Sequence, residues 1–102
     1  MKTAIFAAAI GLASFAAPAV IAADYEVQML SRDSEGRLMQ FEPAFLQIEP
    51  GDTVTFVPTD PSHNSESIAD VIPDSAEGWK GRINEEITVT LTEPGLYAYK
   101  CL

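Results

Sequence analysis

The residues of this sequence with the clearest capacity for metal chemistry are one imidazole and one thiol. His63 is the single histidine of the 102-residue chain and Cys101 is its single cysteine. An imidazole and a thiolate together suit zinc or copper. Two imidazoles, a thiolate and a weak axial thioether suit a copper ion that shuttles between two oxidation states. The residue types alone do not choose between these metals.

Each of the two residues also has an ordinary structural explanation. A lone histidine in a loop is more often a solvated side chain than a ligand, and a lone cysteine is most often a small buried hydrophobe. A nucleophilic cysteine needs a nearby base and usually a third, orienting group. No Gly-rich turn or helix start surrounds Cys101. We therefore expect no enzyme activity, and carboxylate pairs such as Glu85 and Glu86 are expected to form a solvated acidic surface.

Both candidate residues follow segments with strand character. Val54 and Phe56 share one face of a strand expected at 53–57, and His63 lies in the loop after it. A final strand is expected to begin at residue 96 and to lead to Cys101. The imidazole and the thiol could then reach the same end of one folded domain.

The remaining segments predict an all-β domain. Period-two patterns and turn residues indicate a hairpin from 25–30 to 38–41 and a further strand at 87–91. Residues 59–82 are rich in Pro, Ser, Asp and Gly, so we expect a long loop there, with a helical turn near 67–71. Short strands separated by Gly and Pro turns indicate an antiparallel sandwich or barrel. The pattern alone does not separate these topologies.

The amino-terminal residues have the composition of an export signal. Lys2 precedes an Ala-rich apolar stretch, and small residues come just before Asp24. This is typical of a secretory signal peptide, which we assign to residues 1–22, with 23–102 as the mature domain. Cleavage one residue later would fit almost as well. A transmembrane anchor is the alternative, and Gly, Ser and Pro residues that interrupt the apolar run argue against it.

Charge and cysteine content narrow the possible partners. The formal net charge of −9 disfavours nucleic acid, and removal of the leader would leave no membrane segment. Export into an oxidising compartment with a single cysteine excludes an intramolecular disulfide. The lone thiol therefore needs another partner, such as a metal.

Several segments of the chain resemble one known family in order and spacing. They are residues 41–44, 50–60, 63–64, 72–74, 80, 83–85, 94–95 and 100–101. Together they are similar to the pseudoazurins, type 1 blue copper proteins that belong to the cupredoxins. The resemblance covers nearly all of the expected mature domain.

The resemblance implies a Greek-key β-sandwich that holds one copper ion through two His, one Cys and one Met. It makes His63 the first His ligand and Cys101 the Cys ligand, and it gives Asn64 the task of fixing the ligand loop and tuning the thiolate. It also implies a monomeric periplasmic protein that exchanges one electron, as Cu(II)/Cu(I), with redox partners such as copper nitrite reductase.

Two departures from the family pattern qualify this expectation. The family continues after the Cys with the second His, the Met, the rest of the last strand and C-terminal helices, whereas Leu102 is the final residue here. We therefore expect a domain and a copper site that are incomplete at the C-terminus, with neither robust folding nor a blue site in residues 23–102 alone. The family also rings its copper edge with lysines, and this acidic chain keeps only Lys80, Arg82 and Lys100. The alternatives are a metal-free exported β-sandwich that binds a partner and a non-functional truncated remnant.

Overall fold

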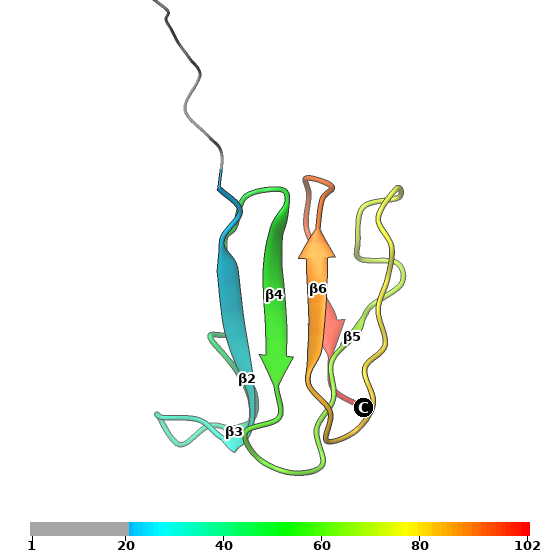
Figure 1. The fold of residues 1–102 in the computed structure, drawn as a ribbon. Helices are drawn as coiled ribbons and strands as arrows, with labels where there is room; N and C mark the ends of the chain where they lie inside the picture. The colour runs from blue at the N-terminus through cyan, green and yellow to red at the C-terminus, as the bar shows by residue number, and fades with distance from the viewer. Residues whose placement is uncertain (1–20) are drawn as a thin grey trace, which may run out of the picture.

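The computed structural model describes residues 21–102, and all regular secondary structure within them is β-strand (Figure 1). The strands are β2 (Asp24–Arg32), β3 (Leu38–Glu42), β4 (Asp52–Val57), β5 (Glu66–Ser67), β6 (Ile87–Leu91) and β7 (Tyr99–Lys100). One sheet has the order β3-β2-β4-β6, and β5 pairs with β7 in a second sheet. The all-β prediction is confirmed. No membrane-spanning helix is found from residue 21 onward.

The larger sheet mixes two kinds of strand pairing. β2 and β3 are antiparallel neighbours, which confirms the predicted hairpin, and β4 is antiparallel to β6. β2 and β4 run parallel, and their register pairs Val27 with Phe56. Because side chains alternate between the two faces of a strand, this register places both residues on the same face of the sheet.

The core lies on the inner face of β2 and β4. Val27, Met29, Val54 and Phe56 are each no more than 3% exposed. Between them along each strand stand exposed or half-buried residues, so the alternation seen in the sequence is a core pattern. Burying a side chain of this kind stabilises a fold by about 1.5 to 3 kcal/mol.

An aromatic cluster joins the small sheet to the large one. The ring of Tyr99 on β7 meets Phe56 edge to face at a centroid distance of 4.8 Å and Phe41 at 4.9 Å. Trp79 stacks on Phe56 at 5.9 Å. Burial raises the pKa of the Tyr99 hydroxyl. These contacts hold β7 over the core, behind β6 in Figure 1.

The long loop and the final strand differ in detail from the sequence expectation. The segment 59–82 contains β5, and Glu66 also forms an isolated bridge with Lys80. In place of a helical turn, Val71 donates one backbone hydrogen bond to Ile68 at 2.8 Å. The last strand is only Tyr99–Lys100, because the residues before it are held by loop hydrogen bonds such as Ala98 N to Val71 O.

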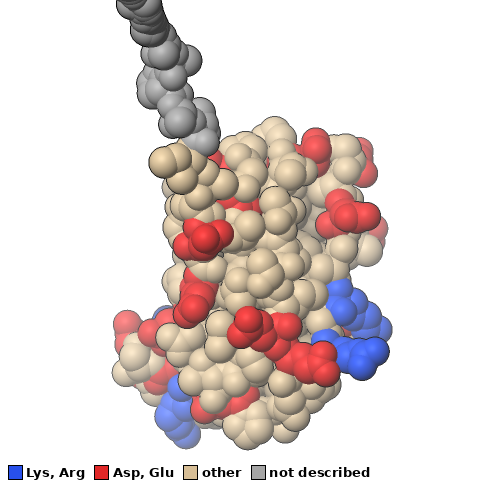
Figure 2. Space-filling model, viewed as in Figure 1, with Lys and Arg blue, Asp and Glu red and all other residues tan. Residues whose placement is uncertain are grey.

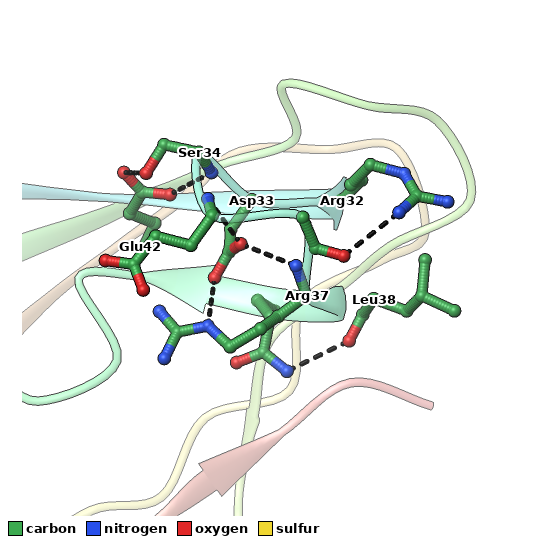
Figure 3. A network of polar contacts seen from close by, with 9 residues as sticks. Arg32, Asp33, Ser34, Arg37, Leu38 and Glu42 are labelled. Carbon is green, nitrogen blue, oxygen red and sulfur yellow. Dashed lines mark hydrogen bonds and ion pairs between the residues drawn. The ribbon is translucent and has the colours of Figure 1, made fainter.

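The β2–β3 hairpin is closed by a network of polar contacts (Figure 3). The Asp33 carboxylate accepts hydrogen bonds from the backbone N of Glu35 and Arg37 and an ion-pair contact of 2.7 Å from Arg37 Nε. Burial alone would raise the pKa of Asp33, but these donors hold it below its ordinary value. Arg32 adds a hydrogen bond to the Gly36 carbonyl. The turn is therefore fixed by side chains as well as by backbone pairing.

Candidate metal centre

The loop after β4 positions the imidazole of His63. The Asp60 carboxylate accepts a hydrogen bond from Ser31 N at 2.8 Å, which ties the loop to the end of β2. On the other side, Asn84 N donates to the His63 carbonyl at 2.9 Å. His63 is only 6% exposed. The histidine predicted from the sequence is thus a buried, anchored side chain and not a solvated one.

The two ring nitrogens of His63 face different partners. Nε2 lies 2.9 Å from the Ser31 hydroxyl oxygen, and Nδ1 lies 3.6 Å from Cys101 Sγ. The serine contact fixes the ring orientation and turns Nδ1 toward the sulfur. Hydrogen bonding at the nitrogen remote from a metal is how proteins orient histidine ligands. Sequence reasoning missed Ser31, because a serine in a strand carries no distinguishing signal.

The end of β7 positions the thiol of Cys101. The β5–β7 ladder pairs Glu66 with Lys100, so the residues on either side of this pair come close together. Asn64 N accordingly points its hydrogen at Cys101 Sγ, at 3.4 Å. Cys101 is half-buried and forms no disulfide. The structure therefore brings together the two residues that the sequence analysis singled out.

Asn64 connects the segments that carry these two donors. Its side chain is 1% exposed, donates from Nδ2 to the Gly81 carbonyl at 3.0 Å, and accepts at Oδ1 from Leu102 N at 2.7 Å. Gly81 also donates from its backbone N to the Ser65 carbonyl, and a Cβ at position 81 would stand 3.1 Å from that same oxygen. A Cβ at this position would crowd that oxygen, so glycine suits the close approach. The contacts of Asn64 tie the two donor segments to each other and to Gly81.

The spacing of the two donor atoms fits a shared metal ion. Metal bonds of about 2.0 Å to nitrogen and 2.3 Å to sulfur, at a roughly tetrahedral angle, place the two donors about 3.5 Å apart. The observed separation of Nδ1 and Sγ is 3.6 Å. Within residues 21–102, no third His, Cys, Asp or Glu joins the pair. The described residues therefore supply two donors, one borderline and one soft, which suits copper or zinc.

A hollow of about 530 Å³ opens beside the pair, between β2, β3 and the two donor loops. Its lining residues are Met29, Leu30, Ser31, Met39, Gln40, Phe41, Pro61, Ser62, His63, Cys101 and Leu102. The lining is mostly apolar apart from Ser31, Gln40, Ser62 and the donors themselves. An apolar surround lowers the local dielectric and strengthens electrostatic interactions at a metal.

Comparisons with known proteins point in one direction. Residues 27–102 match the family described as copper binding proteins, plastocyanin/azurin family. The chain is 52% identical over 95 residues to a pseudoazurin of Paracoccus pantotrophus, covering 93% of this chain and 64% of that protein. It is 48% identical over 85 residues to a putative pseudoazurin of Rhizobium leguminosarum bv. viciae, covering 83% of this chain and 55% of that protein.

Solved structures give the same result. A pseudoazurin from Sinorhizobium superposes with a TM-score of 0.76 at 54% identity, covering 78% of this chain and 62% of that one. The native pseudoazurin of Hyphomicrobium denitrificans gives a TM-score of 0.74 at 42% identity, covering 76% of this chain and 63% of the other. These likenesses confirm the predicted cupredoxin-like β-sandwich. The chain spans less than two thirds of the length of each of these relatives.

Proposed function

The chain belongs to the plastocyanin/azurin family of copper-binding proteins, and on this premise we propose that His63 and Cys101 are ligands of a type 1 copper site that transfers electrons. The observation that best supports the proposal is the 3.6 Å separation of Nδ1 and Sγ. Copper is the cofactor of this family, and when bound it supplies one-electron exchange between Cu(II) and Cu(I).

The residues around the two donors suit such a site. Ser31 holds the imidazole by its Nε2, and Asn64 holds the thiol by its backbone N. The Asn64 side chain binds the segments on both sides through Gly81 and Leu102. The family resemblance assigns a second His and a Met as the remaining ligands of the site.

A visible absorption band tests the ligand assignment. The experiment joins this chain to a family segment that supplies a second His and a Met, and then adds copper(II). We expect an intense visible band from thiolate-to-copper charge transfer. Cys101→Ser should abolish the band, and His63→Ala should weaken copper binding and distort the spectrum. The exposed replacement Ser75→Ala should leave the band unchanged. A band that survives Cys101→Ser would contradict the assignment.

We further propose that the protein works in the periplasm and exchanges electrons with redox partner proteins, copper nitrite reductase among them. Asp and Glu side chains are scattered over the visible face in Figure 2, with Lys and Arg at its margins. Lys100 is half exposed and lies 3.7 Å from Glu66 Oε2. Electrostatic steering by such groups acts over a Debye length of about 8 Å at physiological salt and mainly alters association rates.

Salt dependence tests this docking. Electron-transfer rates with a copper nitrite reductase should change as salt is raised, and Lys100→Glu should shift them at low salt. Lys100→Gln is the matched control, which removes the charge without reversing it and should have the smaller effect. Rates that stay flat from low to high salt would remove electrostatic steering from the proposal.

A further inference from the structure

The carboxylate of Asp52 is buried at the start of β4, and no cationic side chain among residues 21–102 pairs with it. Asp52 is 4% exposed, and its Oδ2 accepts a hydrogen bond from Glu49 N at 2.9 Å. The ion pairs found among residues 21–102 join Arg37 to Asp33 and Lys100 to Glu66, and neither involves Asp52. A buried charge costs free energy unless it is paired or well hydrogen-bonded. Among the described residues this carboxylate is held by backbone N–H donors, with no positive charge beside it.

The other oxygen of Asp52 points at the nitrogen of Ala23. Ala23 N donates to Oδ1 at 2.8 Å, and the Ala23 carbonyl accepts from Thr53 N at 3.0 Å. These two contacts extend the parallel β2–β4 ladder, whose register begins with Asp24 beside Thr53. Just before this point the chain is no longer packed against the domain, since Ile21 is 86% exposed. The anchored part of the chain thus begins at the nitrogen of Ala23.

The sequence predicts cleavage of the export leader between Ala22 and Ala23, and we propose that the α-ammonium of Ala23 created by this cut forms an ion pair with the buried carboxylate of Asp52. One water molecule hydrolyses the peptide bond between the two residues. Its oxygen stays on the Ala22 carbonyl carbon, which becomes a carboxylate, and the freed nitrogen of Ala23 becomes an amine that takes up a proton. The nitrogen that was a neutral donor to Oδ1 becomes a charged one. Charged hydrogen bonds are about twice as strong as neutral ones.

The geometry distinguishes this cleavage position from the one that follows Ala23. Cleavage after Ala23 would remove both the nitrogen that contacts Asp52 and the carbonyl that contacts Thr53. Of its hydrogen bonds from Ala23 N and Glu49 N, the buried carboxylate would then keep only the second. The sequence agrees, because small residues are preferred three positions before the cut, and Val20 is smaller than Ile21. The proposal depends on the export leader expected from the sequence and not on copper binding.

The first test locates the cut. The chain is expressed with its leader, the periplasmic fraction is collected, and the amino terminus is identified by intact mass and peptide sequencing. We expect a protein that begins at Ala23. A product that begins at Asp24, or one that retains the leader, would overturn the proposal.

The second test asks whether the new amine is paired. The amine of the exported protein is labelled near neutral pH with a reagent that modifies α-amines, and the rate is compared with that of the free peptide Ala-Asp-Tyr-Glu. The reagent reacts only with the unprotonated amine. If the contact with Asp52 favours the protonated amine by about tenfold, labelling should be slower by about tenfold. Labelling at the free-peptide rate would overturn the pairing.

Two variants identify the partner of the amine. Asp52→Asn should return the labelling rate toward that of the free peptide, whereas Asp70→Asn, at an exposed loop position, should leave it slow. A glycine inserted before Ala23 tests the same contact without altering the turn that holds Asp52. The α-amine of the inserted glycine should be labelled at the free-peptide rate. Slow labelling of this amine would overturn the assignment of Asp52 as the partner.

Discussion

The two sheets of the molecule are stabilised in different ways. The four-stranded sheet rests on alternating apolar side chains, with Val27 and Phe56 paired across its parallel strands. In the small sheet, β5 and β7 contain two residues each and depend on aromatic contacts and on side-chain hydrogen bonds to the backbone. The candidate metal centre takes one donor from a loop of the large sheet and the other from the end of the small one. Its geometry therefore depends on how firmly the sheets are joined.

The largest effect is expected where one side chain serves both sheets. Phe56→Ala should lower the free energy of unfolding by about 3 to 5 kcal/mol, because it leaves a cavity between β4, Trp79 and Tyr99. Denaturant unfolding measures the loss. Phe45→Ala, at a side chain that is 76% exposed, should change stability by less than about 0.5 kcal/mol. Equal losses in the two variants would contradict the role of Phe56 as the joint.

A smaller loss of stability is expected at Asn64, which joins the segments beside the Cys101 thiol. Asn64→Ala should cost about 2 to 3 kcal/mol, because it leaves the Gly81 carbonyl and Leu102 N without their partner. Freed from this contact, the end of β7 should also expose Cys101 to faster modification by a thiol reagent. The exposed replacement Gln47→Ala should alter neither quantity. Unchanged thiol reactivity would show that Asn64 does not hold the donor segment.

A still smaller effect on stability is expected at Ser31. Ser31→Ala should cost about 1 kcal/mol, because it removes the hydroxyl that pairs with the buried imidazole of His63. Its main consequence should be a change in the NMR signals of the His63 ring nitrogens, as the imidazole loses its fixed orientation. Ser31→Thr keeps the hydroxyl and should restore them. If alanine and threonine behave alike, the contact does not orient the ring.

The weakest effect on stability is expected only at acidic pH, and it comes from Asp33 in the β2–β3 hairpin of the large sheet. The pKa of Asp33 is lowered from its ordinary value of 3.8, since its hydrogen bonds to Arg37 and Glu35 outweigh burial. A carboxyl with a lowered folded-state pKa stabilises the fold above its unfolded pKa, and this contribution is lost as pH falls through the folded value. Stability measured from about pH 5 to pH 2 should therefore fall more steeply for the native chain than for Asp33→Asn. Parallel curves would contradict this.

The strands of the large sheet could be predicted from the sequence, although the parallel pairing of β2 with β4 was not, and the small sheet was not predicted at all. Alternation in 25–30 and 53–57 carries a period that reports burial directly, and those strands are present. Glu66 and Ser67 have no such pattern, because two residues cannot show a period, and their pairing is fixed by Trp79 and Lys100 from elsewhere in the chain.

The candidate centre was found only in part. His63 and Cys101 were identified by their chemistry, and the resemblance added Asn64, whose contacts the structure supplies. Ser31 was not identified, because its contact with the imidazole arises from the packing of β2 against a loop that follows β4. The orientation of a ligand is a property of the packed fold, and no local pattern in the sequence encodes it.

The separation of the two donors along the chain has a consequence for the order of events in folding. Cys101 and His63 are 38 positions apart, and the parallel pairing of β2 with β4 also joins distant segments. Contacts between distant residues form slowly, because the entropy of closing a long loop must be overcome before they can stabilise the chain. The two donors should therefore meet late in folding, once loops of this length have closed. A metal ion would then be captured by an assembled domain and would not act as a nucleus for its folding.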